Sequence, residues 1–251
     1  MKKYTVVTGA SSGIGYTSAI AFAERGKNLI LIARRELKLV ELKDSINAQF
    51  PDVDVIIKPF DLTDIDNLEV SFKQLDDYFI ETWVNNAGFG YHTSIQEQSI
   101  SRSREMIQLN VESLTVLSLL YVQKYSNQPG TQLINISSIG GYLMIPTAVT
   151  YGATKFYVSS FTEGLALEMR SKNLPLKAKV LAPAATETEF GQVANDIDDF
   201  DYNKAFSTFH TAEDMAQLLM DLYDSDQIVG VVDRKTFDFT LSENRFDYGG
   251  K

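Results

Sequence analysis

The sequence predicts a doubly wound α/β fold, in which a parallel sheet of about seven strands carries helices on both faces. Short apolar runs alternate with longer amphipathic segments along the 251 residues, and strands separated by helices form parallel sheets with right-handed crossovers. No break in composition marks a second unit, so we expect a single domain over residues 1–251.

The expected elements follow from apolar periodicity and from the residues that bound each run. Strands are predicted at residues 4–8, 28–33, 53–58, 80–84, 133–137, 176–182 and 228–232. Helices are predicted from Gly13 onward and at about 36–49, 64–76, 97–110, 111–125, 151–171 and 213–223. Residues 183–211 follow neither period, and we expect an irregular insertion there that covers the substrate.

Composition excludes several classes of function. The chain has no cysteine and two histidines, which excludes a disulfide framework and a zinc site of the usual type, so no metal is predicted. A net charge of −10 disfavours nucleic acid as a partner. Since no secretion signal and no apolar run of the ~20 residues needed to span a bilayer is present, a soluble, cytoplasmic protein without a membrane partner is expected.

Three glycines join the first predicted strand to the first predicted helix. Gly9, Gly13 and Gly15 follow the strand directly, where the backbone must turn tightly and let a diphosphate approach the amides of a helix N-terminus. The spacing is a variant of the usual dinucleotide fingerprint of Rossmann folds. Other residues of this turn that we expect to contact a dinucleotide are Ser11, Ser12 and Ile14.

Arg34 and Arg35 end the second strand, where a site that prefers NAD usually carries an acid. Two arginines therefore favour NADP(H); we assign Arg34 to the 2′-phosphate and Arg35 to stacking on the adenine. Alternatively, the pair is solvated and only begins a charged helix. Asp61 and Leu62 follow the third strand and are expected beside the adenine, although Asp61 is equally well placed to cap the next helix.

Tyr151 and Lys155 are four residues apart at the start of a predicted helix and so share one face. An ammonium beside a phenol favours the phenolate, which lowers the pKa of the tyrosine and suits it to acid–base catalysis. Ser137 and Ser138 end the fifth strand, at the sheet edge where open α/β folds bind ligands. A serine hydroxyl there can donate to an oxygen that gains charge, or it can simply form a turn.

Taken together, these motifs resemble the short-chain dehydrogenase/reductase family over about residues 3–232. The motifs that carry the resemblance are Thr8 to Gly15, Asn85-Asn86-Ala87-Gly88, Asn110, Ser138 and Tyr151-x-x-x-Lys155. The resemblance implies that Tyr151 is the catalytic acid and base, that Ser138 stabilises the substrate oxygen, and that Lys155 lowers the pKa of Tyr151 and binds the nicotinamide ribose. It also implies that Asn110 positions a water molecule in a proton relay.

The resemblance extends to further cofactor contacts. It makes Asn86, Ala87 and Gly88 a turn on the cofactor side, and it places Thr188 at the nicotinamide carboxamide. The family's usual Pro-Gly after the sixth strand is Pro183-Ala184 here, a departure that shifts the backbone under the nicotinamide. The complete set of contacts expected after this strand is Pro183, Ala184, Thr186 and Thr188.

These assignments predict an NADP(H)-dependent oxidoreductase that reduces a small aldehyde or ketone, or oxidises the alcohol. Apolar side chains are expected to line the substrate space or to anchor its cover: Phe89, Tyr91, Tyr142, Leu143, Met144, Ile145, Phe190, Phe200, Tyr202, Phe206 and Phe209. The acidic run at 196–201 is expected to be solvated, or else to favour a cationic substrate.

Two alternatives for the function stay open, namely a non-catalytic NADP-binding regulator and a sugar-nucleotide enzyme with a larger C-terminal part. Symmetric self-association into a homodimer or homotetramer is also expected, because residues 111–125 and 151–171 carry more apolar side chains than one buried face requires.

Overall fold

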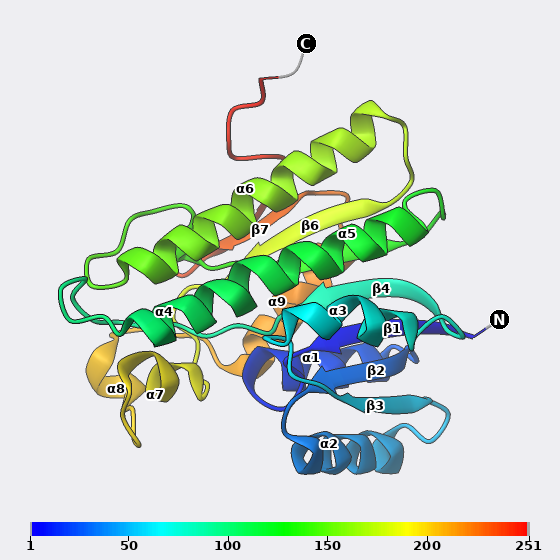
Figure 1. The fold of residues 1–251 in the computed structure, drawn as a ribbon, viewed down its shortest axis with the longest axis horizontal. Helices are drawn as coiled ribbons and strands as arrows, with labels where there is room; N and C mark the ends of the chain where they lie inside the picture. The colour runs from blue at the N-terminus through cyan, green and yellow to red at the C-terminus, as the bar shows by residue number, and fades with distance from the viewer. Residues whose placement is uncertain (1, 250–251) are drawn as a thin grey trace.

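A computed structural model describes residues 2–249 and contains one eight-stranded sheet with helices on both faces (Figure 1). The strand order is β3-β2-β1-β4-β5-β6-β7-β8, and all neighbours are parallel except β7 and β8. The strands are β1 Lys3–Thr8, β2 Asn28–Ala33, β3 Val55–Pro59, β4 Phe79–Asn85, β5 Gln132–Ile136, β6 Lys177–Ala182, β7 Val229–Val232 and β8 Phe239–Ser242. The predicted doubly wound fold is confirmed.

The first seven strands are those predicted, and β8 is an addition that the sequence did not reveal. β8 has four residues, none of them buried, and it pairs antiparallel with β7 at the edge of the sheet. An exposed edge strand needs no run of apolar residues, so periodicity could not identify it.

Nine α-helices lie within the described residues: α1 Gly13–Glu24, α2 Glu36–Gln49, α3 Leu68–Lys73, α4 Ile100–Ile107, α5 Leu114–Tyr125, α6 Val149–Ser171, α7 Phe190–Asn195, α8 Tyr202–Ala205 and α9 Ala212–Asp224. Side chains of α3, α5 and α6 share one apolar core with the sheet, and side chains of α1, α2 and α9 share the core on the opposite face. Alternation along each strand produces both cores, since Val6 enters the first and Val7 the second.

The two helices predicted at 97–110 and 111–125 differ from the observed ones. α4 begins at Ile100, where Ser99 caps it by accepting a hydrogen bond from the Arg102 amide. A π-helical turn, Gln108–Ser113, then joins α4 directly to α5. Such turns inside helices frequently lie at functional sites, and this one contains Asn110.

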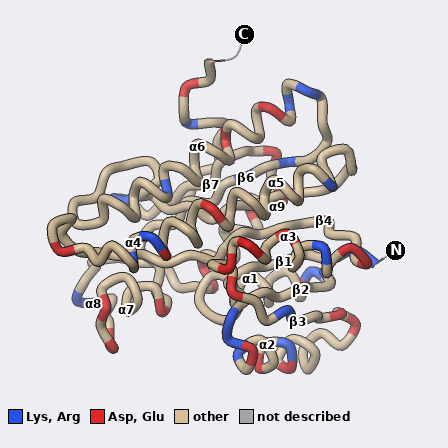
Figure 2. The backbone as a smooth tube through the Cα atoms, in the orientation of Figure 1, with Lys and Arg blue, Asp and Glu red and all other residues tan. Residues whose placement is uncertain are grey.

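The insertion at 183–211 is less irregular than predicted, because it forms the short helices α7 and α8. The acidic loop between them is visible in Figure 2. Among the helices of residues 2–249, none has the length and apolar character required to cross a membrane.

Candidate active site

One large cavity, of about 1150 Å³, lies along the sheet edge formed by the carboxyl ends of β1 to β6. Open α/β folds bind ligands at this edge, where the strand order reverses on either side of β1 and β4. The predicted site residues that line the cavity are Gly9, Ser11, Ser12, Gly13, Ile14, Arg34, Arg35, Asp61, Leu62, Asn86, Ala87, Gly88, Ser138, Tyr151, Lys155, Pro183, Ala184, Thr186 and Thr188. Gly15 and Asn110 do not contribute to the wall.

The three glycine positions of the turn are constrained by backbone conformation or by close neighbours. Gly9 and Gly13 have positive φ values of 66° and 55°, a conformation that glycine adopts without strain. A Cβ atom on Gly15 would lie 2.4 Å from the Gly9 carbonyl oxygen and 2.4 Å from Asn86 Nδ2. Gly15 therefore supports the turn from behind, and the open side faces the cavity at the N-terminus of α1.

The turn after β4 braces the glycine turn. Thr8 Oγ1 accepts hydrogen bonds from the amides of Asn86 at 2.9 Å and of Ala87 at 3.1 Å. Asn86 Nδ2 donates to the Thr8 carbonyl oxygen at 3.0 Å. The two turns thus form one rigid floor of the cavity.

The two arginines after β2 have different surroundings. Arg35 donates to Ser12 Oγ at 2.7 Å and to Ser11 Oγ at 3.1 Å, so it lies on the glycine turn. Arg34 Nη1 lies 3.8 Å from carboxylate oxygens of both Asp61 and Glu105. The roles predicted for these arginines, phosphate binding for Arg34 and stacking for Arg35, do not follow from this arrangement.

Asp61 forms a local turn rather than a helix cap. Its Oδ1 accepts hydrogen bonds from the Thr63 amide at 3.0 Å and from Thr63 Oγ1 at 2.8 Å. The helical turn that follows, Ile65–Asn67, is preceded by Asp64. Asp61 also lines the cavity, so its predicted place beside the adenine of a cofactor is compatible with the geometry.

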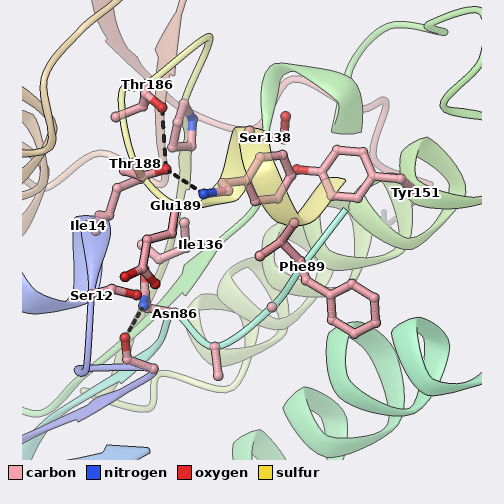
Figure 3. Close-up of a pocket in the computed structure, with 18 of the residues that line it drawn as sticks. Ser12, Ile14, Asn86, Phe89, Ile136, Ser138, Tyr151, Thr186, Thr188 and Glu189 are labelled. Carbon is pink, nitrogen blue, oxygen red and sulfur yellow. Dashed lines mark hydrogen bonds between the residues drawn. The ribbon is translucent and has the colours of Figure 1, made fainter. Parts of the chain in front are cut away.

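Tyr151 lies in the first turn of α6, and its side chain is almost fully buried at 6% exposure. Figure 3 shows its hydroxyl directed into the pocket that Ser138 also faces. Burial raises the pKa of Tyr151 to about 12, and a hydrogen bond with Ser138 lowers it in part. This direction is opposite to the lowering that the sequence predicted, because desolvation outweighs every favourable contact in the protein without cofactor.

Lys155 lies one turn further along α6 and is equally buried. Its Nζ donates to the Ile136 carbonyl oxygen at 2.9 Å and lies 5.8 Å from the centre of the Tyr151 ring. Burial lowers the pKa of Lys155 to about 8. Within the described residues this is its one hydrogen bond, which leaves two of the three ammonium protons free to donate into the cavity.

The two serines after β5 have separate roles. Ser137 is buried and donates to the Lys155 carbonyl oxygen at 2.9 Å, which ties β5 to α6. Ser138 Oγ accepts a hydrogen bond from the Gly140 amide at 3.1 Å, so it forms the turn and lines the cavity as well.

Asn110 is buried behind the cavity wall. Its Nδ2 donates to the Phe89 carbonyl oxygen at 2.9 Å and to Thr154 Oγ1 at 3.2 Å, and its Oδ1 accepts from the Phe89 amide at 3.1 Å. The Asn110 side chain therefore fixes the loop after β4 against α6. Gly88 lies between Asn110 and Lys155, close to Asn110 Oδ1 and Lys155 Nζ.

The segment after β6 closes the cavity from the other side. Thr188 Oγ1 accepts from the Phe190 amide at 3.1 Å and donates to the Thr186 carbonyl oxygen at 3.4 Å (Figure 3). A Cβ atom on Gly13 would lie 3.0 Å from Thr188 Cγ2. Thr188 therefore lies directly across from the glycine turn.

Part of the predicted apolar set lines the cavity: Phe89, Ile145, Phe190, Phe200, Tyr202 and Phe206. The remaining members, Tyr91, Tyr142, Leu143, Met144 and Phe209, lie outside the lining. Tyr142, for example, donates to the buried Glu163 carboxylate at 2.5 Å and stacks on Phe246. Tyr142 is thus an anchor, whereas Met144 is 90% exposed and neither lines the cavity nor anchors its cover.

The four aspartates of the acidic run, Asp196, Asp198, Asp199 and Asp201, do not line the cavity, although Phe200 between them does. Asp196 pairs with Arg102 at 2.6 Å, and Asp201 caps α8 by accepting from the Lys204 amide. A cationic substrate therefore gains no support from this run.

Several polar residues of the cavity were not predicted, and two of them, His92 and Glu189, lie close to predicted site residues. His92 lies in the loop after β4 with its ring 5.6 Å from the Tyr151 ring, centre to centre, and burial lowers its pKa, which favours the neutral form. Glu189 lies 2.9 Å from Arg35. His92 follows Phe89 and Tyr91, which the sequence analysis expected at the substrate space or its cover. The ion pair of Glu189 joins residues 154 positions apart in the sequence, so no local pattern could indicate it.

Comparisons with known proteins agree with this geometry. The model of the "short chain dehydrogenase" family matches residues 3–198. Human dehydrogenase/reductase SDR family member 11 is 30% identical over 214 residues, which are 82% of this chain and 81% of that protein. Sulfoacetaldehyde reductase 2 of Chromohalobacter salexigens is 29% identical and covers 87% of each chain.

Solved structures show the same architecture. A short-chain dehydrogenase from Sphingobium yanoikuyae in complex with NADPH is 28% identical, with a TM-score of 0.81 over 92% of this chain and 87% of that chain. A bulky-bulky ketone specific alcohol dehydrogenase from Comamonas testosteroni is 25% identical, with a TM-score of 0.78 over 92% and 86%. Sequence, fold and site therefore agree that this chain belongs to the short-chain dehydrogenase family of oxidoreductases.

Proposed function

We propose that the protein is an NADP(H)-dependent oxidoreductase that interconverts a small, apolar carbonyl compound and its alcohol, with Tyr151 as the general acid and base. The observation that carries the proposal is the continuity of the cavity, which extends from the glycine turn to Tyr151, Ser138 and Lys155 without a dividing wall. A dinucleotide bound along it would place its two ends at these two groups of residues.

The residues present fit a nicotinamide dinucleotide. The glycine turn has no space for a Cβ atom at Gly9 or Gly15, and it opens toward the cavity at a helix N-terminus. Lys155, with two free donors, would hold the nicotinamide ribose, and Thr188 would contact the carboxamide. A reduced nicotinamide bound there would supply the hydride.

The proton chemistry is assigned to this chain's own side chains. During reduction Tyr151 donates its hydroxyl proton to the substrate oxygen, and Ser138 donates a hydrogen bond to the same oxygen as charge develops on it. The Lys155 ammonium stabilises the phenolate that remains. Asn110 holds the loop after β4 against α6, and we assign to it the positioning of a water that returns the proton.

Arg34 and Arg35 support the choice of NADP(H), because no acidic residue occupies the end of β2 and two guanidinium groups line the cavity there. The neighbour from Sphingobium yanoikuyae was solved with NADPH. We expect NADPH to bind more tightly than NADH, and Arg34→Asp to reduce this preference by about tenfold. Fluorescence titration of both cofactors measures it, and equal affinities in the wild-type protein would refute the assignment.

The substrate side favours an apolar carbonyl compound. Phe89, Ile145 and Phe190 pack in one apolar cluster with Tyr151 and line the cavity there, and His92 adds one neutral polar group beside it. The ketone specificity named for the Comamonas testosteroni neighbour agrees with such a lining.

Self-association through α5 and α6 is part of the proposal. Leu119 and Tyr157 are exposed there by 46% and 38%, next to a shallow hollow lined by Leu119, Val122, Phe161 and Leu165. We expect a homodimer or homotetramer by sedimentation velocity, and a monomer at micromolar concentration would contradict this.

The most direct test of the function is Tyr151→Phe, assayed with NADPH on a panel of aldehydes and ketones. We expect turnover to fall by about 10²- to 10⁴-fold, because the general acid is lost, while NADPH affinity stays unchanged. Wild-type activity in the variant would refute the mechanism. Tight NADPH binding by a wild-type protein that is inactive on the whole panel would instead favour a cofactor-binding regulator.

A further inference from the structure

An acidic side chain stands in the part of the cavity that the glycine turn lines. Glu189 Oε2 lies 2.9 Å from Arg35 Nη2, and about half of each side chain is exposed. Figure 3 shows the Glu189 carboxylate directed toward Ser12 and Asn86. The hydrogen bond from Arg35 lowers the pKa of Glu189, so the group is charged at neutral pH.

Two separate segments hold the Arg35 guanidinium. Besides Glu189, its guanidinium donates to Ser12 Oγ at 2.7 Å and to Ser11 Oγ at 3.1 Å. The ion pair therefore bridges the cavity from the end of β2 to the start of α7, across the glycine turn.

This arrangement conflicts with the binding of an anion. A diphosphate at the glycine turn brings negative charge close to the Glu189 carboxylate, and like charges at this range repel. Arg35 Nε and Nη2 already donate to Ser11 and Ser12, and Nη2 also pairs with Glu189. A phosphate therefore gains a bidentate grip that includes Nη2 only if Glu189 releases it.

If Glu189 released Arg35, the movement of Glu189 would also affect the part of the cavity beside Tyr151. Glu189 is the N-cap residue directly before α7, and the first residue of that helix, Phe190, has its ring 5.5 Å from the Tyr151 ring and 6.0 Å from the His92 ring. The His92 amide also donates to the Ala194 carbonyl oxygen in α7, at 2.7 Å. A shift of Glu189 therefore moves a wall of the substrate space.

We propose that Glu189 competes with the phosphates of the cofactor for Arg35, and that its displacement couples cofactor binding to the position of α7 beside Tyr151. This inference rests on the proposed function, since it takes a nicotinamide dinucleotide as the ligand. It makes Glu189 a determinant of cofactor affinity and of the order in which cofactor and substrate bind.

Glu189→Gln tests the competition, with Glu187→Gln as the matched control. Glu187 is exposed two residues earlier, has no ion pair within the described residues and lies outside the cavity lining. In fluorescence titrations at low salt, Glu189→Gln should bind NADPH and NADH about fivefold more tightly than the wild type, the gain expected for an exposed pair. The gain should shrink at high salt, and Glu187→Gln should change neither affinity by more than a small fraction of this.

Hydrogen–deuterium exchange of residues 190–195 tests the coupling. NADPH should alter exchange in the wild type, whereas Glu189→Gln without cofactor should already exchange like the wild-type complex. Unchanged cofactor affinity in Glu189→Gln, or an equal response to NADPH in both proteins, would overturn the inference. If the wild type binds NADH alone, the cofactor assignment fails, and the same two measurements made with NADH still decide the role of Glu189.

Discussion

Two lysines of this protein are buried, but their ammonium groups differ in how many hydrogen bonds they donate to the protein. Lys179, in β6, is 1% exposed, and its Nζ donates to the carbonyl oxygens of Leu222, Tyr223 and Ser225 at 2.7 to 2.8 Å. Lys155, in α6, is 6% exposed and donates to the Ile136 carbonyl oxygen alone. An ammonium has three protons to donate, so Lys179 is saturated and Lys155 is not.

The comparison distinguishes Lys179, whose three donors are used within the protein, from Lys155, to which we assign a functional role. Lys179 satisfies carbonyl groups at the end of α9, where a helix leaves its last acceptors without partners. The free donors of Lys155 face a cavity shared with Tyr151 and Ser138. A buried cation with unused donors is costly unless a ligand completes its hydrogen bonds, which points to a bound partner at Lys155.

Substitution by methionine should mainly reduce turnover at Lys155 and mainly reduce stability at Lys179. Lys155→Met should therefore have the larger effect on catalysis. We expect carbonyl reduction with NADPH to fall by about 10²- to 10³-fold, because the charge that stabilises the Tyr151 phenolate is lost. The free energy of unfolding should change by less than about 1 kcal/mol, since one hydrogen bond and one buried charge disappear together. Steady-state kinetics and urea denaturation measure the two effects.

Lys179→Met should instead affect stability. Three carbonyl groups lose their donor, so we expect the free energy of unfolding to fall by about 3 kcal/mol. Turnover at 20 °C should stay near the wild-type value while the protein remains folded. If Lys179→Met abolished turnover in folded protein, or Lys155→Met unfolded the chain, the distinction between the two lysines would be wrong.

The pH dependence gives a smaller and more specific test. Burial lowers the pKa of Lys155 to about 8, so its charge is present below that pH and disappears as the pH rises through it. Tyr151, whose pKa is raised to about 12, stays protonated over the same range. We therefore expect kcat/KM for carbonyl reduction, which reports groups of the free enzyme, to fall to about half at pH 8. A flat profile up to pH 9.5 in folded protein would exclude a role for the charge of Lys155.

The sequence predicted those features that depend on local order. Seven strands followed from apolar runs, and the glycine turn and the Tyr151–Lys155 pair followed from spacing. The π-helical turn around Asn110 was missed, because a change of backbone hydrogen bonding within a helix has no side-chain pattern. β8 was missed because it is short and exposed.

Properties that depend on distant segments could not be predicted. The sign of the pKa shift at Tyr151 depends on burial by the insertion and the loop after β4, which a four-residue spacing does not report. The two arginines after β2 are the same residue type in adjacent positions, so the sequence does not distinguish them. In the structure Arg35 pairs with Glu189, whereas Arg34 lies near Asp61 and Glu105. Distinguishing them required the three-dimensional arrangement of four separate segments.

The central claim is that Lys155 and Tyr151 face the nicotinamide end of a bound dinucleotide. A crystal structure of the NADPH complex tests it most directly. We predict that Lys155 Nζ keeps its bond to the Ile136 carbonyl oxygen and donates to the nicotinamide ribose, with the Tyr151 hydroxyl near the carbon that transfers hydride. A complex in which the diphosphate lies away from Gly9 to Gly15, or in which Lys155 contacts no part of the cofactor, would contradict the claim.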